Sequence, residues 1–94
     1  MTSNPKLTIG MPVYNGELFI KKAIESILDQ TFTDFELIIS NNSSSDSTEK
    51  ICQDFIDKDN RIQIHTQKKN IGIHRNFNFL LSQAKGEYFA WAAV

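Results

Sequence analysis

The sequence predicts an α/β fold, a three-layer α/β/α sandwich around a Rossmann-like, mostly parallel sheet. Four short apolar runs alternate with three segments of helical apolar spacing along the 94 residues, which is the pattern of a parallel α/β sheet. The first two runs look apolar on both faces, as expected of central parallel strands. Because crossovers between parallel strands are right-handed, we expect strand order 3-2-1-4 within one domain over residues 1–94.

The first half of the chain contains two of the predicted strands and the first helix. A strand over Lys6–Val13 ends at the turn residues Tyr14, Asn15 and Gly16. From Leu18, helical spacing defines one buried face, made of Ile20, Ala23, Ile24, Ile27 and Leu28. The second strand is predicted over Phe35–Ile39, and a polar loop over Asn41–Ser47 follows it.

The second half begins with a helix whose N-cap we expect to be Asp46, with Glu49 at the capping-box position. Its buried face is predicted to hold Ile51, Cys52, Phe55 and Ile56. A short alternating strand over Ile62–His65 comes next. A third helical face then contains Phe77, Leu80, Leu81 and Ala84, and a fourth strand is predicted over Tyr88–Val94.

Composition narrows the class of protein. Hydrophobic residues make up 40% and charged residues 22%, as in ordinary globular domains. The formal net charge is -1, so we expect no nucleic-acid partner held by bulk electrostatics. The single cysteine fits a reducing compartment. No apolar run approaches the ~20 residues of a membrane span, and residues 1–6 contain no apolar signal core, so a soluble, cytoplasmic protein is expected.

Polar residues gather where a ligand is expected. With strand order 3-2-1-4, a topological switch point lies beside the first strand, and ligands bind there outside the carboxyl ends of the strands. Tyr14 can stack against a flat ring, while Asn15, Asn41 and Asn42 offer donors and acceptors to a base or ribose. Arg75 could face a phosphate or a carboxylate. The alternative, in which Tyr14 packs on the helix and Asn15 only caps it, stays open.

Several enzyme classes lack their motifs in this sequence. No GxGxxG follows the first strand, which argues against a dinucleotide-binding domain, and no P-loop is present. A phosphoacceptor domain would need clustered acids after the first strand, where only Glu17 occurs. Cys52 lies on a predicted core face, and His65 and His74 lack metal-ligand spacing, so we predict no metal site in these residues.

Two long stretches resemble the N-terminal, nucleotide-binding half of a family 2 glycosyltransferase with the GT-A fold. They are IGMPVYNGELFIKKAIESILDQTFTDFELIISNNSSSDST and NIGIHRNFNFLLSQAKGEYFAWAA. The features that this chain shares with the family are a strand ending PxYN, a helix ending SxLxQT, an NxGxxxxxN segment and a strand near GEYF. Several blocks match in order over nearly the whole chain.

The resemblance implies roles for individual positions in a nucleotide site. Pro12 would shape the strand end, Tyr14 would lie against the base, and Asn15 and Glu17 would organise that pocket. Asn41 stands where many members have an Asp that holds the base or ribose. Arg75 lies in a segment that borders the nucleotide-sugar in the family, and Asp46 is expected to cap the helix.

The sequence departs from the family in two ways. Asn41 lacks the charge of the usual Asp, so hydrogen bonds from a base to it would be weaker neutral ones. The chain also ends before the DxD-type motif that holds Mg²⁺ or Mn²⁺ on the diphosphate. The resemblance therefore implies Mg or Mn for the full-length enzyme, while we expect this chain to bind none and to be inactive alone.

The resemblance also implies partners for the parent protein. These are a nucleotide-sugar donor and a glycan or lipid-linked acceptor, with inversion at the anomeric carbon. UDP-sugar is favoured, and thymidine or guanosine donors stay open. Membrane association of the parent would come from other regions. The alternative is a non-catalytic nucleotide-binding or self-associating module, because the apolar strand over Tyr88–Val94 has an uncovered edge that invites self-association.

Overall fold

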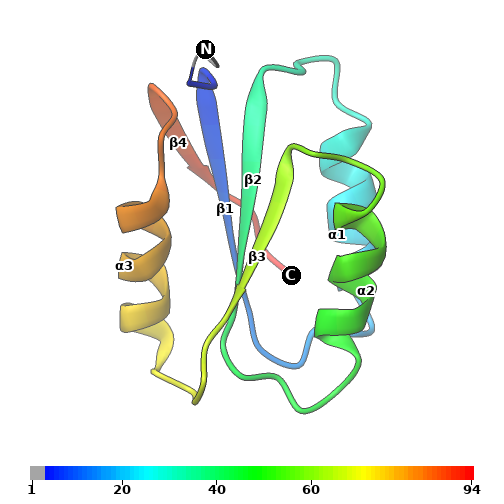
Figure 1. The fold of residues 1–94 in the computed structure, drawn as a ribbon, viewed down its shortest axis with the longest axis vertical. Helices are drawn as coiled ribbons and strands as arrows, with labels where there is room; N and C mark the ends of the chain where they lie inside the picture. The colour runs from blue at the N-terminus through cyan, green and yellow to red at the C-terminus, as the bar shows by residue number, and fades with distance from the viewer. Residues whose placement is uncertain (1–3) are drawn as a thin grey trace.

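The computed structural model describes residues 4–94, which form alternating strands and helices (Figure 1). The predicted alternation is confirmed. The elements are β1 (Leu7–Val13), α1 (Ile20–Leu28), β2 (Phe35–Asn41), α2 (Thr48–Ile56), β3 (Ile62–Thr66), α3 (Ile73–Gln83) and β4 (Tyr88–Trp91). No helix among the described residues is long and apolar enough to cross a membrane.

The four strands are parallel and lie in the predicted order β3-β2-β1-β4. β1 pairs with β2 from Leu7–Phe35 to Val13–Asn41, whereas its pairing with β4 stops at Gly10–Trp91. Figure 1 shows the three layers, with α1 and α2 on one face of the sheet and α3 on the other. The α/β/α prediction is therefore correct.

The face of the sheet toward α1 and α2 is apolar throughout. Alternate residues of β1 and β2 point to this face and pack against the buried stripe of α1 and against Cys52 of α2. This core consists of Ile9, Met11, Val13, Ile20, Ile24, Ile27, Phe35, Leu37, Ile39, Cys52 and Ile62. Burial of this apolar face is expected to be the main favourable contribution to the free energy of folding.

The face toward α3 is different, and the prediction that β1 and β2 are apolar on both faces is wrong. Here the intervening residues include Thr8, Gly10, Glu36 and Ser40, and Thr8, Glu36 and Ser40 are buried with hydrogen-bond partners. Ser40 donates to Oδ1 of Asn76 on α3 over 2.5 Å. Hydrogen bonds of this kind hold α3 to the sheet alongside the apolar contact of Leu80, which is fully buried.

On this second face, a buried carboxylate lies near the amino-terminal ends of the strands. Oε2 of Glu36 accepts hydrogen bonds from the Thr8 hydroxyl over 2.6 Å and from the Lys85 backbone N–H over 2.8 Å. The Gly86 N–H donates to the Thr8 hydroxyl over 2.8 Å. A Cβ at Gly86 would lie 2.5 Å from the Thr8 nitrogen, so glycine is needed for this close approach. The turn before β4 is thus fastened to β1 and β2.

Some predicted boundaries and caps are also wrong. β2 continues to Asn41, and β4 ends at Trp91 instead of Val94. The predicted α3 face is only partly buried, because Phe77 and Leu81 are exposed while Asn76 is buried. The residue before α2 is Ser47, so Asp46 is not its N-cap, although Oδ1 of Asp46 still accepts from the Thr48 N–H over 3.0 Å. Glu49 accepts instead from the Thr66 hydroxyl, so no capping box forms.

Candidate functional site

A pocket lies at the carboxyl ends of the strands, on the α3 face of the sheet. Its volume is about 340 Å³, and apolar atoms dominate its surface. Its walls come from the end of β1, the β2–α2 loop, the first half of α3, and β4 with the residues after it. The lining residues are Pro12, Val13, Tyr14, Asn42, Ile73, Asn76, Phe77, Trp91, Ala92, Ala93 and Val94.

Pro12 explains why the sheet opens at this point. The β1–β4 register ends at Gly10–Trp91, and the Ala92 N–H donates to the Gly10 carbonyl over 2.9 Å. The next residue of β1 that could donate toward β4 is Pro12, which has no N–H. On its other side β1 stays paired with β2 as far as Val13. Pro12 and the residues after the last β1–β4 pair, Ala92 to Val94, all line the pocket.

Aromatic rings form much of the pocket wall. Tyr14 is 54% exposed and Trp91 is 47% exposed. The Phe77 and Trp91 ring centroids lie 4.6 Å apart with the planes tilted by 30°, and Phe89 meets Trp91 edge-on at 4.6 Å. Phe89 in turn covers Gly10, where a Cβ would approach its ring to 2.6 Å. Exposed aromatic faces beside an apolar hollow are suited to a flat, weakly polar ring.

The β1–α1 and β2–α2 loops lie beside the pocket, at the carboxyl ends of the strands, and are hydrogen-bonded to each other. The Asn15 side-chain oxygen accepts from the Ser45 N–H over 2.9 Å, and Asn15 donates its own N–H to the Ser44 hydroxyl. Oε2 of Glu17 accepts from the Ser47 N–H over 3.1 Å. Oδ2 of Asp46 accepts from the Glu17 N–H over 3.2 Å. The β1–α1 and β2–α2 loops therefore hold one another in place.

The Asp46 carboxylate accepts hydrogen bonds from both the β1–α1 loop and the start of α2. The Thr48 hydroxyl donates to its Oδ1 over 2.5 Å, and this hydrogen bond is the main reason why the pKa of Asp46 lies below the usual 3.8. The Thr48 hydroxyl also accepts from the Gly16 N–H over 3.0 Å. The same threonine thus connects the carboxylate, the start of α2 and the β1–α1 turn.

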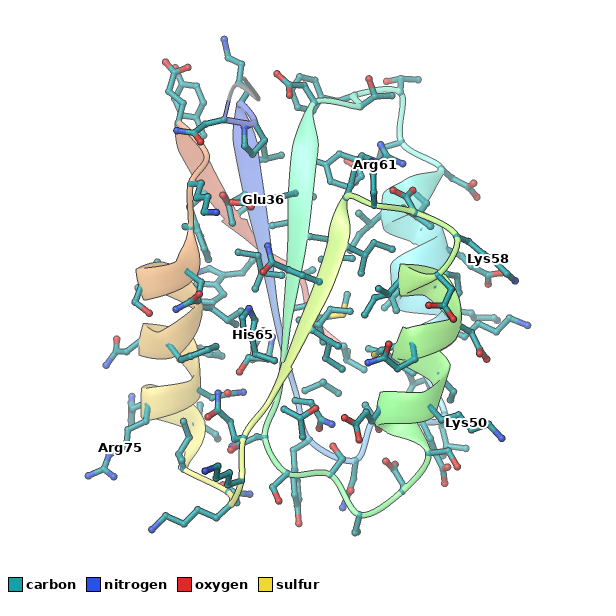
Figure 2. All side chains as sticks on the ribbon, in the orientation of Figure 1. Glu36, Lys50, Lys58, Arg61, His65 and Arg75 are labelled. Atoms are coloured by element: carbon teal, nitrogen blue, oxygen red, sulfur yellow. The ribbon has the colours of Figure 1, made fainter. Side chains whose placement is uncertain are left out.

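The predicted site residues are only partly brought together. Pro12 and Tyr14 line the pocket, whereas Asn15 and Glu17 lie beside it with their side-chain oxygens bound to the neighbouring loop. Asn41 is 1% exposed, and its Oδ1 accepts from the N–H and hydroxyl of Ser44. Arg75 is exposed and points away from the sheet (Figure 2). The roles of these residues toward a nucleotide stay predictions.

Asn42, which the sequence offers together with Asn41 as a donor and acceptor for a base, lines the pocket, whereas Asn41 does not. Three other lining residues have no predicted site role: Asn76, which is 3% exposed on α3, Phe77 and Trp91. Phe77 and Trp91 were assigned to a helix face and a strand. The usable signal was their aromatic character on elements that border a switch point, but their contact depends on the tertiary packing of α3 against β4.

The described residues do not supply a divalent-metal site. No carboxylate lines the pocket. Within residues 4–94, no group of three or more His, Cys, Asp or Glu side chains is placed to hold a metal ion. Mg²⁺ and Mn²⁺ bind through oxygen ligands, chiefly carboxylates. The residues present therefore do not fit such an ion.

This architecture defines a class before any relative is considered. An open parallel α/β sheet with an apolar, aromatic pocket at the carboxyl ends of its strands, beside the switch point, is typical of a nucleotide-binding domain. Residues 8–92 match the family described as Glycosyl transferase family 2, and the chain belongs to that family. The resemblance inferred from the sequence is therefore confirmed.

Relatives and solved structures extend this assignment. The chain is 39% identical over 85 residues to the GalNAc(5)-diNAcBac-PP-undecaprenol beta-1,3-glucosyltransferase of Campylobacter jejuni, covering 89% of this chain and 28% of the relative. It superposes on S. aureus TarS 1-349 in complex with UDP-GlcNAc with a TM-score of 0.86 at 26% identity, covering 94% of this chain and 26% of TarS 1-349.

A third likeness concerns the fold alone. The mannosyltransferase PcManGT of Pyrobaculum calidifontis, solved with GDP-Man and Mn2+, gives a TM-score of 0.81 at 21% identity, over 92% of this chain and 26% of that protein. The chain spans from 10% to 35% of the length of the curated relatives it matches first.

Proposed function

We propose that the whole protein transfers a sugar from a nucleotide-diphosphate sugar to a glycan or lipid-linked acceptor, and that residues 4–94 bind the nucleoside part of the donor. The observation that carries this proposal is the aromatic pocket at the carboxyl ends of β1 and β4. Membership of the glycosyltransferase family supports the reaction class. The C. jejuni relative, named as a glucosyltransferase acting on an undecaprenol-linked glycan, supports a lipid-linked acceptor.

In this proposal the chain's residues bind and orient the donor. The exposed ring of Tyr14 and the Phe77–Trp91 pair supply faces on which a base stacks, and the apolar walls exclude water from it. The loops joined by Asn15, Glu17 and Asp46 keep the rim of the pocket rigid. Orientation of the base directs the diphosphate out of the apolar pocket toward the rest of the enzyme.

We favour a uridine diphosphate donor and a divalent ion for the whole enzyme. Structures of S. aureus TarS 1-349 with UDP and with UDP-GlcNAc support the uridine donor. PcManGT with GDP-Man and Mn2+ is the fold-level parallel for the metal. A bound Mg²⁺ or Mn²⁺ would neutralise charge on the leaving diphosphate. Its ligands would come from residues beyond those described here, and we expect the chain alone to be inactive.

An NMR amide titration of the chain with UDP, with GDP and dTDP as comparisons, tests the proposal. We expect the largest shifts near Tyr14, Asn42 and Trp91. Base–aromatic stacking is worth about 1–3 kcal/mol, so Tyr14→Ala should weaken UDP binding roughly tenfold. The matched control is Phe32→Ala, which removes an exposed ring from the α1–β2 loop at the opposite edge of the sheet. Shifts that spread evenly over the surface, or equal losses in both variants, would contradict the proposal.

We also propose that the isolated chain self-associates through β4. β4 pairs with β1 only, so its outer edge has free backbone groups among the described residues. Tyr88 and Trp91 on this strand are exposed. The Tyr88 and Ala92 N–H groups donate to β1, so the alternate N–H of Phe89 points to the outer edge. Light scattering should show a dimer whose population falls in Phe89→Pro, which removes this outward N–H, relative to Phe89→Ala, which keeps it. A monomer at millimolar concentration would contradict this proposal.

A further inference from the structure

We propose that Asn42 is a positioning residue that holds the wall of the pocket in place through a set of hydrogen bonds to Asn70, Ile71 and Gly72. We name these four residues the amide latch. The inference rests on the proposed function, because it assigns to the latch the geometry of the nucleoside pocket. It assigns no contact between Asn42 and the nucleotide.

The polar groups of Asn42 are already used within the protein. Its Nδ2 donates to Oδ1 of Asn70 over 3.0 Å and to the Gly72 carbonyl over 3.5 Å. Its Oδ1 accepts from the Ile71 N–H over 2.8 Å. Asn42 is 4% exposed, and its own backbone N–H donates to the Val13 carbonyl over 2.9 Å. A side chain engaged in this way can fix its neighbours but has no free donor for a base.

The latch acts on the point where α3 begins. Gly72 precedes α3 with a φ of 86°, a left-handed conformation that favours glycine. Oδ1 of Asn70 also accepts from the Gly72 N–H over 2.8 Å, and the Gly72 carbonyl accepts from the Asn76 N–H over 3.1 Å. The backbone of the β3–α3 loop is therefore fastened to the end of β2 immediately before the helix starts.

The start of α3 is also the wall of the pocket. Ile73 and Phe77 line the cavity from the first two turns of the helix, and the Phe77 ring packs on Trp91. A second tie, between Ser40 and Asn76, holds the end of the first helical turn to β2. Because that tie keeps the helix on the sheet from Asn76 onward, loss of the latch should release mainly the loop before α3 and Ile73, and so alter the width of the pocket.

The amide chemistry of Asn42 gives the proposal a specific test. In Asn42→Asp the side chain still accepts from Ile71, but a carboxylate oxygen would then face two acceptors, Oδ1 of Asn70 and the Gly72 carbonyl. Protonation restores a donor at that position. Burial and the facing acceptors both favour the neutral acid, so the introduced carboxyl should protonate well above pH 4. The latch of this variant should break at neutral pH and reform in mild acid.

The experiment measures UDP affinity by NMR titration at pH 7.5 and pH 5, for Asn42→Asp, Asn42→Ala and wild type. Each variant is expressed relative to wild type at the same pH, so that titration of the UDP phosphate cancels. We expect Asn42→Asp to bind about tenfold more weakly at pH 7.5, as loss of buried hydrogen bonds implies, and to recover at pH 5. Asn42→Ala should be weak at both pH values.

Two further variants keep the result interpretable. Asn78→Ala removes an exposed amide from the outer side of α3 and should leave UDP affinity unchanged. Asn70→Ala removes the acceptor from an exposed loop position, so it should fold even if Asn42→Asp does not, and should weaken UDP about threefold. Equal UDP affinity of wild type and Asn70→Ala, or an Asn42→Asp defect that is the same at both pH values, would overturn the proposal.

Failure of the proposed nucleotide binding can be distinguished from failure of the latch. If wild type does not bind UDP, the nucleotide assignment fails, and the latch is then judged by hydrogen exchange of the Ile71 N–H. Protection that is lost in Asn42→Asp at pH 7.5 and regained at pH 5 supports the latch, whereas unchanged protection overturns it.

Discussion

The two faces of the central sheet are built differently although they share the same strands. Toward α1 and α2, the alternate residues of β1 and β2 form a continuous apolar core. Toward α3, the intervening positions hold Thr8, Glu36 and Ser40, each buried and hydrogen-bonded, and the apolar rings near them stay partly exposed. Hydrophobic burial is non-directional, whereas hydrogen bonds fix geometry, so the first face supplies stability and the second positions α3.

This difference locates the site. The pocket opens on the α3 face, where Pro12 ends the pairing of β1 with β4 and where Phe77 and Trp91 are not covered by a second helix among the described residues. On the opposite face, α1 and α2 pack against the buried core. The face with fewer apolar contacts is thus the one with room for a ligand.

The largest effect is expected from a cavity in the apolar face. Leu37 is fully buried in the middle of β2, so Leu37→Ala should lower the free energy of unfolding by about 2–5 kcal/mol. Urea denaturation followed by circular dichroism measures this loss. Leu81→Ala, which shortens an exposed side chain on α3, is the matched control and should change stability by less than about 1 kcal/mol.

A large effect is also expected in the reactivity of Cys52. Burial against the core raises its thiol pKa to about 11, with a smaller contribution from the charge of Glu49. The thiolate fraction at pH 8 should then be roughly two-hundredfold lower than in the unfolded chain. Reaction with a thiol reagent in buffer and in urea tests this ratio. Similar rates in the two solutions would show that the α2 side of the core is open.

A smaller effect is expected from the polar face. Asn76 accepts from the Ser40 hydroxyl and donates to the Ser40 carbonyl over 3.1 Å. Asn76→Ala leaves both Ser40 groups without these partners and should cost about 1–3 kcal/mol. The double variant with Ser40→Ala should cost less than the sum of the two single changes, and strict additivity would argue against the paired geometry.

The smallest effect is the pH dependence associated with Asp46. Its pKa in the folded chain lies below 3.8, so the carboxylate stabilises the fold above that pH, and this contribution is lost as the pH falls through the lower folded value. The difference in urea midpoint between wild type and Asp46→Asn should therefore be present at pH 6 and shrink below pH 4. Asp54→Asn, which removes a carboxylate from the exposed side of α2, is the control for net charge. A constant difference across this range would contradict the assignment.

The strand order and layers could be predicted because they depend on periodicity within each segment and on the handedness of crossovers. Glu36 and Ser40 flank Ile38 on one face of β2, while Phe35, Leu37 and Ile39 form the other. The mixed character of the first of these faces is hard to predict from the sequence, because Leu37-Ile38-Ile39 reads as an unbroken apolar run.

The site was only partly predictable. Tyr14 follows from its place at the end of a strand, and Pro12 follows from the family resemblance. The bonds of Asn15 to Ser45 and of Glu17 to Ser47 join residues 30 positions apart, and their geometry is set by how two loops meet. The pairing of Phe77 with Trp91 likewise depends on packing between α3 and β4. Such contacts have no local sequence signal.

The central claim is that the α3-side pocket holds the base of a nucleotide. The most direct test is to measure intermolecular NOEs between the base protons of UDP and the aromatic protons of the chain. The account predicts cross-peaks from uracil H5 and H6 to the rings of Tyr14, Phe77 or Trp91, and none to Phe32. Cross-peaks confined to other surfaces, or their absence from a folded chain saturated with UDP, would contradict it.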